Sequence, residues 1–315
     1  MNKIPVILDC DPGHDDAIAM LLACASQTLD VKAVTTVGGN QTVAKTTYNA
    51  LRMLKFIDRD IPVAAGADTP IIRKLETAPS VHGESGLDGP VLPKPDRGAL
   101  AISAVELMAE VVENSDVPVT LVPTGPLTNI AVFLLAYPHL RKKIKRISLM
   151  GGAAIGGNWT AAAEFNILVD PEAADIVFRS GIPITMSGLD VTHRAAVYPE
   201  DIQRIRSRGG KVANLVADLL EFFIQFHKSI GWEFAPLHDP CAVAWLIRPE
   251  MFVSKKIPVQ IDITGDYTTG CTVTDLRSVP HSASNVDVLL DVDRQAFINL
   301  LIETVDYYRM QEGKK

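Results

Sequence analysis

The feature that most constrains the fold is a regular alternation, in the first half of the chain, between short β-branched runs and longer segments of helical periodicity. A strand that is followed by a helix and then by another strand builds a parallel sheet with helices on both faces. The sequence therefore predicts an α/β fold around an open, mainly parallel, Rossmann-like sheet. The expected strands are 3–8, 31–37, 62–65, 117–122, 144–150 and 182–187, and the expected helices are 15–25, 43–57, 99–113, 127–136 and 171–180.

The second half of the chain is less regular and richer in helical patterns. Two β-like runs, 257–263 and 270–276, are expected to form a hairpin around Gly265-Asp266. Because no repeat, low-complexity tract or flexible linker interrupts the chain, we expect residues 1–315 to form a single domain with a mostly helical C-terminal elaboration. The other expected elements are helices at 199–206, 212–230, 237–247 and 294–308 and a last strand at 286–290.

Composition excludes several classes of protein. A chain of 315 residues with 47% hydrophobic and 21% charged residues is typical of a globular protein. Its formal net charge of −7 argues against binding to nucleic acid, and no apolar run approaches the roughly 20 residues of a membrane helix. The N-terminus lacks the apolar region of a signal peptide, and the four cysteines are scattered without a CxxC pair. We therefore expect a cytoplasmic protein with reduced cysteines.

An acidic stretch directly follows the first expected strand. Asp9, Asp11, Asp15 and Asp16 stand close together just before and within the start of a helical pattern. Carboxylates so close repel one another, and a hard divalent cation such as calcium or magnesium would compensate them. Helix capping is the simpler alternative, but it explains Asp15 and Asp16 and leaves Asp9 and Asp11 unexplained.

Other polar motifs also follow expected strands. In an open parallel sheet the carboxyl ends of the strands face one crevice, where ligands bind. The sequence therefore predicts one site at this edge of the sheet, although each motif alone could be a cap or a turn. The residues placed there are Asp11, Asn40, Thr124, Gly151-Gly152 and Asp190.

The motifs in this order resemble those of the inosine–uridine-preferring nucleoside hydrolase family over nearly the whole chain. The stretches 81–89 and 158–160 look most like the pyrimidine-preferring bacterial branch. The motifs that carry the resemblance are Asp9-Cys10-Asp11-Pro12-Gly13-His14-Asp15-Asp16-Ala17, Gly38-Gly39-Asn40, Pro123-Thr124-Gly125-Pro126-Leu127-Thr128-Asn129, Met150-Gly151-Gly152, Asn158, Glu164-Phe165-Asn166, Asp170-Pro171-Glu172-Ala173-Ala174 and His238-Asp239-Pro240.

The resemblance implies hydrolysis of the N-glycosidic bond of ribonucleosides, with pyrimidine nucleosides such as uridine and cytidine favoured, to give ribose and a free base. It also implies a bound calcium ion, held by Asp11, Asp16, the backbone carbonyl of Thr124 and Asp239. Asp11 would in addition be the general base that takes a proton from calcium-bound water. Family members are commonly dimers or tetramers, so a homo-oligomer is expected.

The same resemblance assigns the substrate contacts. Ribose contacts fall on Asp15, Asn40, Asn158, Glu164 and Asn166. The leaving base would be assisted by His238, with His82 as a second candidate, because histidine suits proton or hydrogen-bond donation near neutral pH. Residues expected to border the base are Trp159, Phe165, Phe226 and His227, whereas His14 is expected to orient the loop.

Four alternatives remain open at this point. A metal-dependent phosphohydrolase would want lysines or arginines near the strand ends, and the motifs lack them. A nucleotide-cofactor enzyme would want GxGxxG spacing, which the Gly-rich segment 151–157 does not have. A purine-accepting or nonspecific nucleoside hydrolase is the third. A non-catalytic calcium- or ribose-binding protein is the fourth.

Overall fold

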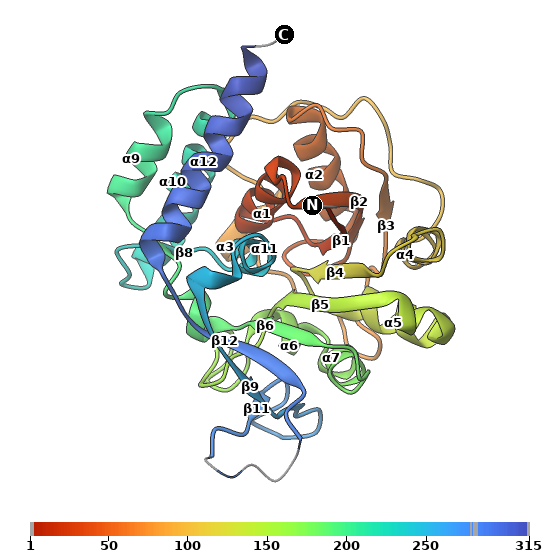
Figure 1. The fold of residues 1–315 in the computed structure, drawn as a ribbon. Helices are drawn as coiled ribbons and strands as arrows, with labels where there is room; N and C mark the ends of the chain where they lie inside the picture. Colours follow the sequence, from red (N-terminus) through yellow and green to blue (C-terminus); the bar gives the residue numbers. More distant parts are fainter. Residues whose placement is uncertain (1–2, 278, 280–282, 314–315) are drawn as a thin grey trace.

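The β-branched runs of the chain form one eight-stranded sheet in the computed structural model, which describes residues 3–277, 279 and 283–313 (Figure 1). All neighbouring strands pair in parallel except the last pair, in which β9 runs antiparallel to β12. The expected α/β fold with a mainly parallel sheet is therefore confirmed. In spatial order the strands are β3 (Val63–Ala65), β2 (Leu29–Thr36), β1 (Ile4–Cys10), β4 (Val119–Pro123), β5 (Ile144–Met150), β6 (Ile184–Ser187), β12 (Val286–Val292) and β9 (Phe252–Ile257).

Two hydrophobic cores lie on the two faces of this sheet. Successive side chains of a strand point to opposite faces, so Val6 and Leu8 of β1 enter one core and Ile7 enters the other. The first face is covered by α1 (His14–Ala25), α2 (Val43–Phe56), α9 (Pro199–Arg206), α10 (Lys211–Ser229), α11 (Asp239–Ile247) and α12 (Arg294–Glu312). The second face is covered by α4 (Ala104–Glu113), α5 (Thr128–Ala136) and α7 (Pro171–Phe178).

The order of the strands reverses between β1 and β4. The chain proceeds outward from β1 through β2 to β3, and then from β4 in the other direction through β5 to β6. At such a switch point the loops that follow the two central strands separate and leave a crevice at their carboxyl ends. The acidic stretch after β1 and Thr124 after β4 therefore lie on the two sides of this crevice.

The C-terminal part of the chain is mainly helical, and it also completes the sheet with β12 and β9. The expected hairpin between 257–263 and 270–276 is present as the antiparallel pair β10 (Val259–Ile261) and β11 (Thr272–Thr274). A second short pair, β7 (Ala196–Val197) and β8 (Ala235–Pro236), ties the segment after β6 to the segment before α11. The remaining short elements are α3 (Pro79–His82), α6 (Phe165–Val169), α8 (Leu189–Thr192), η1 (Pro138–Lys143) and η2 (Pro249–Met251).

Two expectations about the elements are wrong. The helix expected from residue 99 begins at Ala104, because Ser103 caps its N-terminus through a reciprocal pair of hydrogen bonds with Glu106. The preceding residues run beside β3 instead, where Leu100 donates its backbone N–H to the carbonyl of Val63. The edge strand β9 was not expected, because its exposed central positions include Lys255 and Lys256 and hide the β pattern.

Among the described residues, none of the helices combines the length and the hydropathy that a membrane-spanning helix requires.

Candidate active site

Four aspartates meet at the switch point of the sheet. Asp11 lies in the turn after β1, Asp15 and Asp16 in the first turn of α1, and Asp239 at the start of α11. All four are buried, with no more than 4% of any of them exposed. One carboxylate oxygen from each of Asp15, Asp16 and Asp239 lies within 4.8 Å of the other two. The fold therefore brings Asp239 together with three acids from the first 16 residues of the chain.

Hydrogen bonds from neighbouring loops hold Asp11 and Asp16 in place. The backbone N–H of Asn40 donates to Oδ2 of Asp11 at 2.6 Å, and its side-chain amide donates to Oδ2 of Asp16 at 3.2 Å. The hydroxyl of Thr124 donates to Oδ1 of Asp16 at 2.8 Å. The loops approach so closely that a Cβ atom on Gly39 would lie 2.1 Å from Oδ2 of Asp11. Glycine is therefore required beside this carboxylate.

Burial and mutual repulsion make these acids hard to ionise. Burial is the larger cause of the raised pKa of Asp11, and the nearby charge of Asp16 is the second. Burial followed by the charge of Asp16 raises the pKa of Asp15 to about 7. Burial and the charges of Asp15, Asp16 and Asp11 raise the pKa of Asp239 well above its ordinary value.

The cluster fits a hard cation. Oδ1 of Asp11 and Oδ1 of Asp15 are buried oxygens without a hydrogen-bond partner among the described residues. A buried charged oxygen without a partner is costly, and a cation with oxygen ligands would compensate it. The atoms available as metal ligands are all oxygens, which suits calcium or magnesium better than a soft metal.

Asp9 lies behind the cluster, toward the second face of the sheet. Its Oδ1 accepts hydrogen bonds from the hydroxyl of Thr35 at 2.7 Å and from the amide of Asn129 at 2.8 Å. Burial raises the pKa of Asp9 to about 6, against the lowering effect of these two hydrogen bonds. Asp9 therefore joins β1 to β2 and α5, and supports the acidic turn from beneath.

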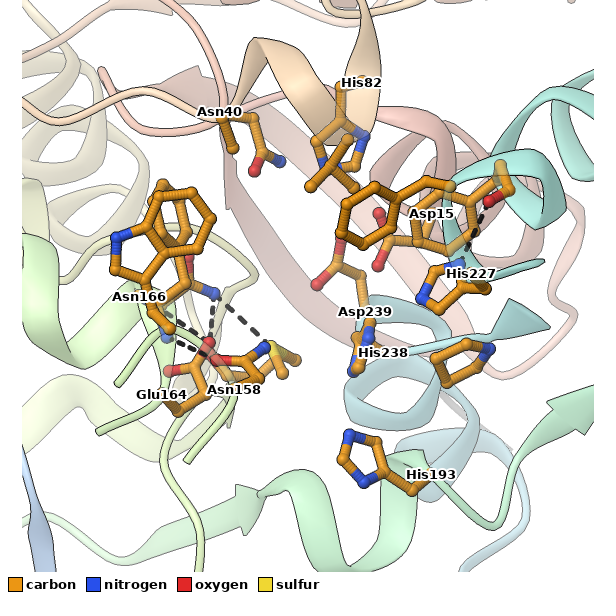
Figure 2. A pocket seen from close by; sticks show the side chains of 18 of the residues that line it. Asp15, Asn40, His82, Asn158, Glu164, Asn166, His193, His227, His238 and Asp239 are labelled. Carbon is orange, nitrogen blue, oxygen red and sulfur yellow. Dashed lines mark hydrogen bonds between the residues drawn. The ribbon is translucent and has the colours of Figure 1, made fainter. Parts of the chain in front are cut away.

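A cavity of about 360 Å³ opens above the acidic cluster (Figure 2). Asp15 and Asp239 line it directly, whereas Asp11 and Asp16 lie beneath and touch the lining residues Asn40 and Thr124. No lysine or arginine is among the described residues of the lining. The residues around the cavity are Asp15, Asn40, Ala78, Val81, His82, Thr124, Met150, Gly157, Asn158, Trp159, Glu164, Phe165, Asn166, His193, Phe223, Phe226, His227, Ile230, Trp232, Pro236, His238 and Asp239.

One wall of the cavity is polar and neutral apart from Glu164. The carboxylate of Glu164 accepts backbone N–H groups of Gly152 at 2.9 Å and of Asn166 at 2.9 Å, and burial raises its pKa. The amide nitrogen of Asn166 donates to the carbonyl of Thr124 at 2.8 Å, which leaves its oxygen as an acceptor for a ligand. The oxygen of Asn158 accepts the backbone N–H of Phe165 at 3.0 Å, which leaves its amide nitrogen as a donor.

Histidines form the opposite wall. His238, His227 and His193 lie together on the side of Asp239, across the cavity from Glu164 and its neighbours (Figure 2). Nδ1 of His238 lies 2.8 Å from the hydroxyl of Thr192, and Nδ1 of His227 lies 3.0 Å from the carbonyl of Phe223. Burial is the main cause that lowers the pKa of each of these three imidazoles, which favours their uncharged forms.

His82 reaches the cavity from α3 and is paired with His14. The backbone N–H of His14 donates to Nδ1 of His82 at 3.3 Å, and the two Nδ1 atoms are 3.2 Å apart. Nε2 of His14 lies 2.8 Å from the carbonyl of Asp88, so His14 anchors the loop that follows α3. Burial lowers the pKa of His82 well below its ordinary value, with the nearby His14 as the second cause.

Aromatic rings border both ends of the cavity. Trp159 packs against Phe165 with ring centroids 4.7 Å apart, and its indole N–H donates to Glu76 at 2.6 Å. At the other end the ring of Phe226 contacts His227, with centroids 5.2 Å apart. The helical stripe of α10 therefore contributes to the core through Phe223 and to the cavity through Phe223, Phe226 and His227.

The structure places almost every expected contact residue in this one cavity, and it corrects the set in two respects. Asp190 does not line the cavity, because its carboxylate accepts the backbone N–H of Ala154 at 2.5 Å and holds that loop. His193 and Trp232 line the cavity and were not expected there. The position of His193 just beyond β6 was the available signal, since the other site residues also follow strand ends.

Comparisons with known proteins show which proteins this chain resembles. A relative from Photobacterium profundum, the pyrimidine-specific ribonucleoside hydrolase RihA, is 57% identical over 96% of this chain and 99% of its own length. The enzyme of the same name from Escherichia coli strain K12 is 54% identical over 97% of this chain and 99% of its own length. Among solved structures, a purine-preferring ribonucleoside hydrolase from Gardnerella vaginalis superposes with a TM-score of 0.91 at 31% identity, covering 97% of this chain and 99% of its own.

The model of one family matches residues 6–299, which include the acidic stretch, the polar wall and His238-Asp239. The chain belongs to the inosine-uridine preferring nucleoside hydrolase family.

Proposed function

We propose that this protein hydrolyses the N-glycosidic bond of ribonucleosides, with uridine and cytidine favoured, and that it depends on calcium. The observation that carries the proposal is the pairing, across one cavity of about 360 Å³, of a buried acidic cluster with a wall of imidazoles. The volume lies in the range of small-ligand sites. The absence of lysine and arginine from the described lining favours an uncharged nucleoside over a phosphorylated one.

The residues proposed to hold calcium are Asp11, Asp16, the backbone carbonyl of Thr124 and Asp239. Support comes from the burial of the acids, the unpartnered Oδ1 of Asp11 and the all-oxygen donor set. When bound, calcium would supply positive charge that acidifies a neighbouring water and attracts the ribose hydroxyls. Asp15 also has an oxygen within 4.8 Å of Asp16 and Asp239, and we assign it to a ribose hydroxyl.

The chain supplies the base and the ribose contacts. Asp11 accepts the proton of the attacking water. Its carboxylate is buried beneath the cavity, where the backbone N–H of Asn40 holds Oδ2 and where Oδ1 has no hydrogen-bond partner among the described residues. Acceptors on the polar wall, Glu164 and the oxygen of Asn166, hold ribose hydroxyls, while Asn158 donates from its free amide. Together with Asn40 and Asp15 they would fix the sugar as positive charge develops on it in the transition state.

The histidine wall is the proposed base site. His238 stands beside Asp239 and presents its ring to the cavity, so it is the proposed donor to the leaving base. His82 is the second candidate donor, and His227, Trp159 and Phe165 would border the substrate. Support for the pyrimidine preference comes from the 57% and 54% identical relatives, both named for pyrimidine specificity. The purine-preferring relative at 31% identity shares the fold, so the fold itself does not set the preference.

Release of reducing sugar from a panel of nucleosides tests the proposal. We expect ribose from uridine and cytidine, slower release from inosine and adenosine, and little from 2′-deoxyuridine. A strong calcium chelator should abolish turnover, and added calcium should restore it. Failure to release ribose from every ribonucleoside would overturn the proposal. Equal rates on purine and pyrimidine nucleosides would remove only the base preference.

We also propose that the protein is a cytoplasmic homo-oligomer, either a dimer or a tetramer. The free state of Cys10, Cys24, Cys241 and Cys271 supports a reducing compartment. Light scattering after size-exclusion chromatography measures the mass in solution, and a monomeric mass at micromolar concentration would contradict the oligomer.

A further inference from the structure

Thr192 lies outside the cavity and contacts the histidine that faces the leaving base. It is the last residue of α8, its side chain is fully buried, and its Oγ1 lies 2.8 Å from Nδ1 of His238. His238 lines the cavity and Thr192 does not. The ring edge that carries Nδ1 therefore faces the protein, and the remaining ring edge faces the substrate space.

The backbone fixes the two residues relative to each other. The backbone N–H of Leu237 donates to the carbonyl of Ala195 at 3.1 Å, and the next residues along pair as the short antiparallel strands β7 and β8. This ladder joins the segment after Thr192 to the segment before His238. The contact between the hydroxyl and the imidazole is therefore held from both sides and does not depend on a mobile loop.

The direction of this hydrogen bond follows from the hydroxyl proton. Among the described residues, Nδ1 of His238 is the one hydrogen-bond partner recorded for Oγ1 of Thr192. A hydroxyl buried to this extent needs an acceptor for its proton, because an unsatisfied buried donor costs about 1–3 kcal/mol. The hydroxyl therefore donates, and Nδ1 accepts with its lone pair. The ring proton of the neutral imidazole must then sit on Nε2, the nitrogen that Thr192 does not occupy.

We propose that Thr192 is a positioning residue for the reaction, which holds His238 in the tautomer whose Nε2–H donates a hydrogen bond to the departing base. This inference rests on the proposed function. When the bond between the anomeric carbon and the base nitrogen breaks, its electron pair goes to the base, and the adjacent carbonyl oxygen of a pyrimidine shares the charge. Nε2–H stabilises that oxygen, and no proton leaves His238 in this step. Water adds its oxygen to the anomeric carbon and gives a proton to Asp11. Afterwards Asp11 releases this proton to solvent, and the base takes up one proton from solvent.

Two substitutions distinguish the effect of the Thr192 hydroxyl from the effect of the side chain's shape. Thr192→Val removes the hydroxyl with almost no change in volume, and Thr192→Ser keeps it. Thr304→Val is the matched control, because it removes another buried threonine hydroxyl, one that donates to the carbonyl of Leu300 within α12.

The substrates are uridine and p-nitrophenyl β-D-riboside, whose leaving group is a stable anion and needs no donor. We expect T192V to lower kcat/KM for uridine about tenfold to a hundredfold, as loss of a group that orients a functional histidine does. The same variant should change kcat/KM for the nitrophenyl riboside less than about threefold. T192S and T304V should stay within about threefold of wild type on both substrates. Equal losses on both substrates, or no loss on uridine, would overturn the proposal.

Nitrogen NMR on ¹⁵N-histidine-labelled protein measures which ring nitrogen of His238 carries the proton, and it requires no substrate turnover. We expect Nδ1 of His238 to give the signal of an unprotonated nitrogen, assigned by its disappearance in H238Q, and to lose that signature in T192V. A protonated Nδ1 in the wild type would overturn the proposed role of Thr192. If the wild type released no ribose, the proposed function would fail, and this spectrum would still decide how Thr192 and His238 are bonded.

Discussion

Replacement of Asp15 by asparagine should stabilise the calcium-free protein at mildly alkaline pH, although it removes a residue of the proposed site. Asp15 is only 4% exposed, and its Oδ1 has no partner among the described residues. Burial, and then the charge of Asp16, raises its pKa from 3.8 to about 7. The folded chain without a cation therefore holds a carboxylate that is costly to ionise.

Proton linkage gives the sign and the size of the expected change in the free energy of unfolding. Between about pH 4 and pH 7 the unfolded chain has released the Asp15 proton while the folded chain keeps it, so the wild type loses stability as the pH rises. A shift from 3.8 to about 7 at about 1.4 kcal/mol per unit sets a ceiling of about 4 kcal/mol at pH 8. Asparagine must still bury an amide, so we expect Asp15→Asn to gain about 2 kcal/mol in the free energy of unfolding.

Urea unfolding with a calcium chelator at pH 5 and at pH 8 measures the effect. We expect the variant to be more stable than the wild type at pH 8 and to show a shallower loss of stability between the two pH values. Asp266→Asn, in an exposed loop, is the control and should follow the wild type at both pH values. A variant less stable than the wild type at pH 8, or a pH dependence identical to that of the wild type, would refute the reasoning.

Three further predictions concern the same cluster. Asp11→Asn should lower kcat for uridine about a hundredfold to ten-thousandfold, as loss of a general base does, while calorimetry with ribose still detects binding. Calcium at about a hundredfold excess over its Kd should stabilise the wild type by about 2.7 kcal/mol in thermal unfolding, and Asp239→Ala should lose this gain. Gly39→Ala should displace the Asp11 carboxylate, whose Oδ2 would lie 2.1 Å from the new Cβ, and so abolish both calcium stabilisation and turnover. Gly98→Ala, with no atom within 4 Å, should retain both, and loss in both variants alike would contradict the steric explanation.

Much of the fold could be predicted from local sequence, because parallel strands are continuous apolar runs and each is followed by a helical pattern. The placement of Asp11 and Thr124 in one crevice followed from strand ends alone. The start of α4 was missed although Ser103 and Glu106 have the spacing of a capping box. The expectation of a single domain over residues 1–315 stays a prediction.

The parts of the site that could not be predicted depend on contacts between distant segments. Whether Asp190 faces the cavity or the backbone of Ala154 is decided by the path of one loop, and no periodicity specifies that path. The pairing of His14 with His82 likewise depends on where α3 docks. The entry of His193 into the cavity required α8 to end just above α11. Residue type and strand ends predict which groups are available, while tertiary packing decides which of them meet.

The joining of α1 and α11 at the acidic floor has a consequence for the way the chain folds. Asp15 and Asp16 are near the beginning of the chain and Asp239 lies more than 200 residues further along, so the two helices meet only when this long loop has closed. Loop-closure entropy must be paid before contacts of such large sequence separation are gained, so we expect this site to assemble after the folding barrier. A cation that binds both Asp16 of α1 and Asp239 of α11 would therefore leave the refolding rate unchanged and slow unfolding, so calcium would act on the lifetime of the native state rather than on the speed of reaching it.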